Sequence, residues 1–68
     1  MKVTKVMQGW YRIFDDNGKE VGDFNNFYGF WSGEVFIDGE YQKAKIVSET
    51  KKQFEKEFAK KYSHLFNV

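Results

Sequence analysis

Residues 24–36 read Phe-Asn-Asn-Phe-Tyr-Gly-Phe-Trp-Ser-Gly-Glu-Val-Phe, and this stretch decides the fold. Bulky aromatic residues dominate it, while its polar residues are mostly small turn formers such as Asn25 and Asn26. Aromatic residues favour strands, whereas Asn and Gly favour turns. The pattern predicts a strand that ends near residue 24, then a turn, then a second strand that begins near residue 30.

The whole chain is short and rich in aromatic residues. It has 68 residues, of which 21% are Phe, Trp or Tyr, and it contains no cysteine. A domain of this length buries a modest share of its surface, and without cysteine it has no disulfide or thiolate metal site to stabilise it. Each buried aromatic ring removes roughly 150–250 Å² from water. We therefore expect a single domain over residues 1–68, stabilised by large side chains, by a partner, or by both.

The charge is nearly balanced, with 11 Lys or Arg against 10 Asp or Glu and a net charge of +1. Domains that bind duplex DNA are usually strongly basic, so the composition argues against that class. The first residues show no apolar run typical of a signal peptide, and no stretch approaches the roughly 20 apolar residues of a membrane span. Together with the absence of cysteine, these features predict a cytoplasmic protein with no membrane partner.

Upstream of the central stretch, residues 3–14 are rich in β-forming residues and predict one strand. Gly9 interrupts the alternation of this segment, which suggests a β-bulge. A strand at about residues 19–24 follows, and the sequence between the two strands favours a hairpin.

The turn of this first hairpin is Asp-Asp-Asn-Gly-Lys over residues 15–19, in which Asn-Gly provides positive φ at low cost. We expect a three-residue loop with Gly18 in the left-handed conformation. That register pairs Asp15 with Lys19 and Ile13 with Val21.

Downstream, a second hairpin is predicted around Asp38-Gly39, with strands at about residues 30–38 and 40–47. A two-residue loop pairs Ile37 with Glu40 and Phe36 with Tyr41. One face of this hairpin then carries the apolar residues that we expect in the core: Trp31, Val35, Ile37, Ala44 and Ile46. The other face carries the Phe36–Tyr41 pair and a Glu34–Lys43 pair.

Residues 50–65 predict an amphipathic helix. Thr50 followed by Gln53 is a capping-box pattern, with Ser48 as the alternative N-cap. Phe54, Phe58, Tyr62 and then Leu65 or Phe66 recur at helical spacing as one apolar stripe. The predicted fold is α+β: an antiparallel meander of three to four strands, forming two hairpins, packed on one C-terminal helix. The second face of such a sheet has no helix to cover it, and an exposed aromatic face favours a partner.

The residue patterns give no indication of catalysis. A nucleophile needs a nearby base, and the single histidine, His64, lies near the end of the predicted helix. Asp15 and Asp16 lie at a hairpin tip, where turn formation accounts for them. The Asp/Asn/Gly run lacks the closing Glu of a calcium loop. We expect no enzyme activity, no cofactor and no metal site.

Protein binding is the function that the composition favours, because Trp, Tyr and Arg dominate interface hot spots. For Trp10 and Tyr28 a place in the core is an equal alternative. We predict a non-enzymatic inhibitor or accessory factor, antitoxin-like or phage-encoded, since small chains without catalytic residues often act in this way. Its partner is a protein, a second copy of the chain, or both. The candidate partner-binding residues are Trp10, Arg12, Phe14, Phe27, Tyr28, Phe30, Phe36 and Tyr41.

The alternative prediction is a single-stranded nucleic-acid binder, in which bases stack on rings while cations track the phosphates. Residues 28–30 (Tyr-Gly-Phe) and 35–37 (Val-Phe-Ile) resemble the two aromatic motifs of cold-shock domains. Phe27 stands where that family has Gly, the spacer is shorter, and the His of the second motif is absent, so the function is not transferred. The candidate nucleic-acid residues are Lys43, Lys45, Lys52, Lys56 and Lys60.

Overall fold

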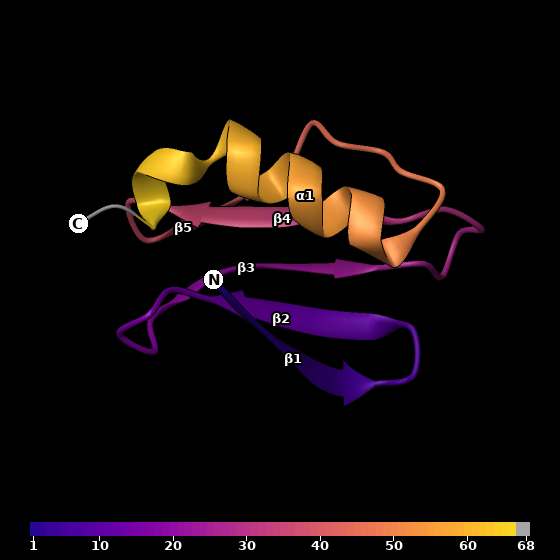
Figure 1. Ribbon diagram of the computed structural model, residues 1–68, viewed down its shortest axis with the longest axis horizontal. Coiled ribbons are helices and arrows are strands. Elements are labelled where there is room, and N and C mark those ends of the chain that lie inside the picture. The colour runs from indigo at the N-terminus through magenta and orange to yellow at the C-terminus, as the bar shows by residue number, and fades with distance from the viewer. Residues whose placement is uncertain (67–68) are drawn as a thin grey trace.

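The computed structural model describes residues 1–66 and shows an α+β fold (Figure 1). Within these residues, strands β1 to β5 form one antiparallel sheet in chain order. The strands are β1 (Lys2–Met7), β2 (Trp10–Phe14), β3 (Glu20–Asn25), β4 (Ser32–Ile37) and β5 (Glu40–Lys43). Helix α1 (Lys51–Lys61) follows, and then the 3₁₀ helix η1 (Ser63–Leu65). The predicted meander with a C-terminal helix is confirmed, with five strands in residues 1–66 instead of three or four.

The prediction of one strand over residues 3–14 is wrong, because the chain reverses at Gly9. Gly9 has a φ of 84°, a left-handed conformation that glycine adopts without steric penalty. Met7 pairs with Trp10 across this turn, so β1 and β2 are separate strands of a hairpin. The expected bulge at Gly9 is therefore a turn, and the irregularity in the register lies within β1, between Lys5 and Met7.

The two predicted hairpin turns have the predicted form. At the first turn, the backbone N–H of Asp15 donates to the carbonyl of Lys19 at 2.9 Å, and Gly18 has a φ of 85°. At the second turn, Asp38 and Gly39 have φ values of 53° and 81°, as a two-residue loop requires. The predicted register of β4 and β5 is confirmed: Glu34 pairs with Lys43, Val35 with Gln42, Phe36 with Tyr41, and Ile37 with Glu40.

A β-bulge overturns one predicted pairing between β2 and β3. Ile13 pairs with Gly22 and Phe14 pairs with Glu20, so Val21 is an extra residue that neither pair includes. Val21 is 3% exposed and belongs to the core, as does Ile13. The predicted opposition of Ile13 and Val21 is wrong because a bulge sets two residues of one strand against one of its neighbour.

The strand predicted at residues 40–47 is shorter in the structure, since β5 ends at Lys43. The following segment keeps the alternation of a strand, with Ala44 and Ile46 buried as predicted. It is tied to the sheet by a hydrogen bond from the Ala44 N–H and by an isolated antiparallel bridge between Trp31 and Ser48. This segment leads the chain from the sheet edge to the start of α1.

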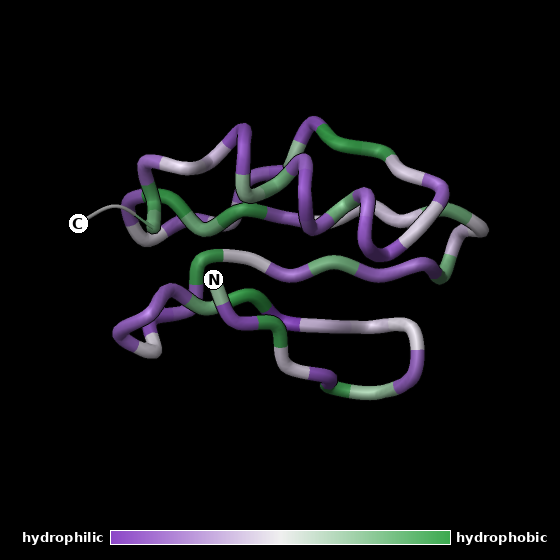
Figure 2. The backbone as a smooth tube through the Cα atoms, in the orientation of Figure 1, coloured by the Kyte–Doolittle hydropathy of each residue, from purple (hydrophilic) through white to green (hydrophobic). Residues whose placement is uncertain are grey.

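Aromatic rings join the sheet to the helix. The ring of Phe24 on β3 stacks on that of Phe54 on α1, with 4.7 Å between centroids, and Phe54 in turn lies 6.0 Å from Phe58. All three side chains are fully buried. Tyr62 packs on Phe58 one helical turn later, so the predicted apolar stripe is confirmed. Beyond the bulge of β3, the buried Phe24 lies between Asp23 and Asn25, and Figure 2 shows the end of this strand as a hydrophobic residue between hydrophilic ones.

The helix starts where its capping sequence predicts. The hydroxyl of Thr50 accepts a hydrogen bond from the N–H of Gln53 at 3.1 Å, and α1 begins at the next residue after Thr50. Near its other end, the ring of Phe58 lies against Gly22, where an added Cβ would come within 2.9 Å of the ring and 2.5 Å of the Glu34 carbonyl. Gly22 therefore allows α1 to approach β3 closely.

We expect Phe58→Ala to lower the free energy of unfolding by about 3–5 kcal/mol, because it leaves a cavity among the packed rings of Phe54 and Tyr62. Chemical denaturation followed by circular dichroism measures this change. Lys52→Ala, on the exposed side of the same helix, is the matched control and should alter stability by less than about 0.5 kcal/mol. Equal unfolding midpoints for the two variants would contradict the assigned core.

Candidate functional site

The sheet has a second face, which we call the open face because α1 packs on the opposite one. Residues opposite one another on neighbouring strands share a face, so the register defines its rows. The row nearest the β3–β4 loop contains Met7, Trp10, Asn25 and Ser32; the central row contains Thr4, Arg12, Asp23, Glu34 and Lys43; the far row contains Phe14 with Glu20, and Phe36 with Tyr41. Five of the eight candidate partner-binding residues thus lie on one face.

Trp10 and Arg12 meet at one side of this face. The Arg12 guanidinium lies 5.5 Å from the centroid of the Trp10 ring, within the range of a cation–π contact. The indole Nε1 of Trp10 donates to the Asp23 carboxylate at 3.4 Å. Trp10 is therefore half-buried on the open face, with its polar atom oriented toward the centre of the sheet.

Two acidic residues are cross-strand neighbours at the centre of the open face. Asp23 on β3 is directly opposite Glu34 on β4, an arrangement in which like charges repel. Arg12 flanks Asp23 and Lys43 flanks Glu34, yet within residues 1–66 neither cation forms an ion pair with them. Burial raises the pKa of Asp23 above its ordinary value, while the hydrogen bond from Trp10 opposes that rise.

An aromatic pair occupies the far row. The rings of Phe36 and Tyr41 meet edge to face, with 4.8 Å between centroids. The Tyr41 hydroxyl donates to the Glu20 carboxylate, and this hydrogen bond raises the pKa of Tyr41. The open face therefore has rings on both sides of its central carboxylates.

The loop between β3 and β4 exposes three further rings. Phe27 is 55% exposed, Tyr28 78% and Phe30 40%. The backbone beneath them is nevertheless tied down: the Asn25 side chain accepts from the N–H of Phe27 at 3.1 Å, and the N–H of Asn26 donates to the carbonyl of Gly9 at 3.0 Å. These bonds hold the loop against the β1–β2 turn, which lies at the same end of the molecule (Figure 1).

A groove of about 360 Å³ connects this loop to the open face. Its lining residues come from the end of β3, the loop, β4 and β5: Asn25, Tyr28, Ser32, Gly33, Glu34 and Lys43. Through Tyr28, the loop and the open face thus form one continuous surface. Together with the neighbouring loop rings of Phe27 and Phe30, we call it the binding surface. Trp31, by contrast, packs against the core, as its predicted position in the second hairpin requires.

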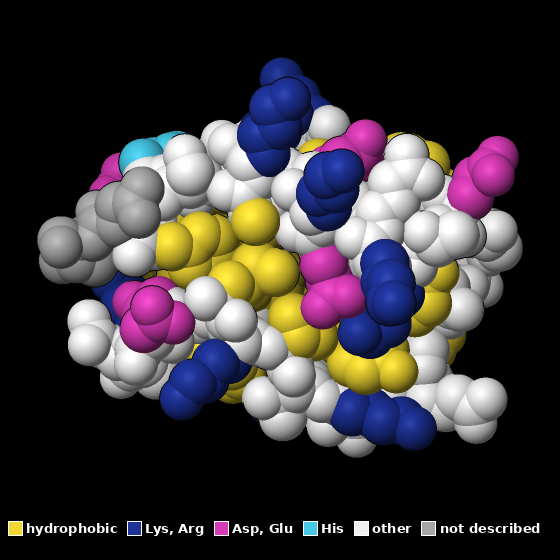
Figure 3. All heavy atoms as spheres, in the orientation of Figure 1, with side chains coloured by type: hydrophobic (Ala, Val, Ile, Leu, Met, Phe, Trp, Pro, Cys, Tyr) yellow, Lys and Arg dark blue, Asp and Glu magenta, His cyan; other side chains and the backbone are white. Residues whose placement is uncertain are grey.

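The candidate lysines divide between two sides of the molecule. Lys43 lies on the open face, whereas Lys52, Lys56 and Lys60 are exposed on α1, which covers the other face. Figure 3 shows Lys and Arg side chains standing out over the helix. Lys45 lines a separate groove with Lys60 and Lys61. The structure therefore does not bring the helix lysines and the rings of the open face together.

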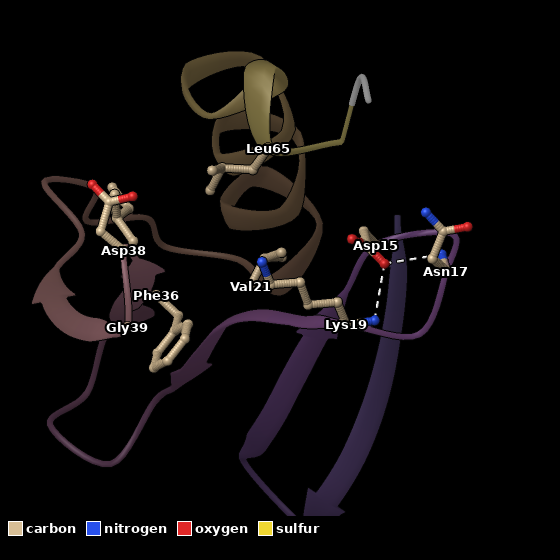
Figure 4. A pocket seen from close by; sticks show the side chains of 9 residues that line it. Asp15, Asn17, Lys19, Val21, Phe36, Asp38, Gly39 and Leu65 are labelled. Carbon is tan, nitrogen blue, oxygen red and sulfur yellow. Dashed lines mark hydrogen bonds between the residues drawn. The ribbon is translucent and has the colours of Figure 1, made fainter.

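Another pocket, of about 370 Å³, lies at the end of the sheet opposite the β3–β4 loop, where the β2–β3 and β4–β5 turns approach Leu65 (Figure 4). Its one buried carboxylate belongs to Asp15, which is 5% exposed. This carboxylate accepts hydrogen bonds from the N–H groups of Asn17 and Lys19, both at 2.9 Å. The structure thus uses Asp15 to form the turn, as the sequence predicts.

Three further observations concern the histidine, metal binding and membrane insertion. His64 is exposed in η1, where its nearest aromatic neighbour is Tyr62. Among residues 1–66, His, Asp and Glu side chains nowhere gather in threes that could hold a metal ion. No helix in the described part of the chain has the length and apolar character needed to cross a membrane.

Sequence reasoning missed the two central carboxylates. With the predicted register, in which Ile13 opposes Val21, Asp23 would oppose Tyr11, a residue packed against the core. The bulge at Val21 shifts the pairing by one residue and puts Asp23 opposite Arg12 instead. The sequence feature that could have indicated the acidic pair is the predicted Glu34–Lys43 pair, because it already placed Glu34 on the surface.

The sequence matches no protein-family model, and no curated protein and no solved structure shows a significant similarity to it. Function is therefore inferred from the geometry of the binding surface alone.

We expect Asp23→Asn to raise the free energy of unfolding at pH 7 by roughly 0.2–1 kcal/mol, because it removes a half-buried negative charge that burial disfavours and that lies near other carboxylates. The amide oxygen can still accept from Trp10. The raised pKa of Asp23 fixes the sign of the pH dependence: the folded state holds the proton more tightly, so ionisation costs stability as pH rises through the folded pKa. The advantage of the variant should therefore shrink below about pH 4, near the pKa of an unfolded Asp.

Urea denaturation at pH 7 and at pH 3 measures this difference. Glu40→Gln, an exposed substitution on β5, is the control for the loss of one negative charge. A variant that is less stable than wild type at pH 7, or equally favoured at both pH values, would contradict the assigned environment of Asp23.

Proposed function

We propose that the protein is a non-enzymatic binding module that docks on a partner protein through the binding surface. The observation that carries this proposal is the β3–β4 loop, in which Phe27, Tyr28 and Phe30 are exposed on a backbone fixed by hydrogen bonds. Apolar rings held in water lose the hydrophobic stabilisation that burial would provide. Docking on a partner recovers this free energy.

The fixed backbone of the loop favours binding in a second way. Ordering flexible side chains and loops opposes association, and a loop that is already ordered avoids part of that cost. Trp10 and Arg12 on the adjoining open face belong to the residue types that dominate hot spots. A module of this kind acts by occupying a surface of its partner, as inhibitors and accessory factors do. A cytoplasmic location is part of the same proposal.

The alternative, binding of single-stranded nucleic acid, is supported less well by the geometry. Such binders need cations beside the rings on which the bases stack. Of the five candidate lysines, Lys43 alone shares the binding surface with the rings, and it lies beside Glu34. A second copy of the chain is compatible with the proposal as the protein partner, and the mass in solution distinguishes self-association from a different partner.

To test the proposed function, the tagged protein is used to capture partners from a lysate of the source organism, with and without nuclease. The captured protein is then purified and titrated by calorimetry. We expect Tyr28→Ala to weaken binding at least about tenfold, with little change in salt dependence, because it removes a ring that docking would bury and leaves the charge unchanged.

Lys56→Ala, on the opposite side of the molecule, is the matched control and should bind as wild type does. If Tyr28→Ala binds as well as wild type, the binding surface is wrongly assigned. Recovery of nucleic acid, with proteins lost after nuclease digestion, would instead support the alternative.

A further inference from the structure

We propose that the groove between Tyr28 and Glu34 receives an arginine side chain of the partner protein. This inference rests on the proposed function and specifies the chemistry of the partner. Besides Lys43, the groove has an exposed ring, an exposed carboxylate and two small polar side chains, those of Asn25 and Ser32. A guanidinium group matches this combination because it is flat, cationic and carries five N–H donors.

The carboxylate of Glu34 is the first contact. Arginine binds carboxylates through two parallel N–H···O hydrogen bonds, which are shorter and stronger than neutral ones. Asp23 lies directly opposite Glu34 and adds a second negative charge beside the groove. No ion pair within residues 1–66 occupies the Glu34 carboxylate, so it is available to a cation from outside, whereas the Asp23 carboxylate already accepts a hydrogen bond from Trp10.

The ring of Tyr28 is the second contact. It is 78% exposed and lines the same groove as Glu34. A guanidinium that reaches Glu34 can lie over this ring in a cation–π contact, which gains strength as water is excluded. A lysine side chain would also neutralise the charge of Glu34. Its ammonium group, however, is a point charge, whereas the flat guanidinium can stack on a ring and form two parallel hydrogen bonds.

Of the two cations nearest the groove, Arg12 is held away from it and Lys43 lines it. Arg12 lies over the ring of Trp10, and it forms no ion pair with Asp23 in the described part of the chain. Lys43 lines the groove as the cross-strand neighbour of Glu34, so it repels an incoming cation. The direction of the effect can therefore be predicted. Removing the charge of Lys43 should increase the affinity of the groove for an arginine side chain and decrease its affinity for an anion.

The direct test is an NMR titration of the ¹⁵N-labelled protein with N-acetylarginine amide. N-acetylcitrulline amide, which has nearly the same shape without the charge, is the control ligand. We expect saturable shifts centred on the amides of Asn25, Tyr28, Ser32 and Glu34 with the arginine compound only. Shifts of equal size with both ligands, or no saturable shift with either, would overturn the inference.

Two charge variants complete the test. Glu34→Gln should weaken the arginine compound about tenfold, the loss expected for one charge-assisted hydrogen bond. Lys43→Gln should strengthen it. Both substitutions are at exposed positions, and the amide spectrum of each variant reports directly that it is folded. If Glu34→Gln binds the arginine compound as wild type does, or if Glu34→Gln strengthens binding while Lys43→Gln weakens it, the groove does not hold a guanidinium.

The same variants, titrated against the captured partner, separate this inference from the proposed function. If Tyr28→Ala loses binding and Glu34→Gln binds as wild type does, the proposed docking surface stands, but the groove does not receive an arginine side chain. Wild-type binding in both variants would reject both. Weaker binding by Glu34→Gln together with tighter binding by Lys43→Gln supports the proposed arginine site, whereas the reverse pattern indicates an anionic partner such as nucleic acid.

Discussion

The stacking of Phe24 on Phe54 is the contact on which the rest of this structure depends. The two rings are nearly parallel, with 11° between their planes, and they join the middle strand of the sheet to the helix. Tyr11 and Trp31 extend the contact on the sheet side, and Phe58 extends it along α1. A chain of 68 residues with no cysteine has few other means of stabilisation. Large rings provide the most buried apolar area per residue, which explains why the composition is so aromatic.

Packing on one face also determines what the other face can do. Because side chains alternate along a strand, packing of Tyr11, Ile13 and Phe24 in or against the core directs Trp10, Arg12 and Asp23 to the open face. Their arrangement there depends on the bulge that admits Val21 to the core. The binding surface is therefore a consequence of how the core is filled, and the β3–β4 loop continues it beyond the end of the sheet.

The parts of the fold that sequence predicted well are those governed by local chemistry. Asp38-Gly39, Gly18 and the Thr50 cap each impose a backbone geometry on their own neighbours, and each lies where predicted. The misses depend on contacts distant in sequence. Gln8-Gly9 lacks the Asn-Gly or Asp-Gly signal of a tight hairpin, and its turn is fixed by the hydrogen bond from Asn26. The bulge at Val21 arises where β3 meets both β2 and the core, so no local pattern indicates it.

The charges of the open face are best understood through the same constraint. A domain this small has only a few kcal/mol of stability, and opposing Asp23 to Glu34 lowers it further. Neither carboxylate is neutralised by an ion pair within residues 1–66, although Arg12 and Lys43 are their cross-strand neighbours. The core gains nothing from this arrangement, because both side chains point away from it. A cation supplied from outside would turn the repulsion into attraction, so the same pair that weakens the isolated fold would strengthen a complex.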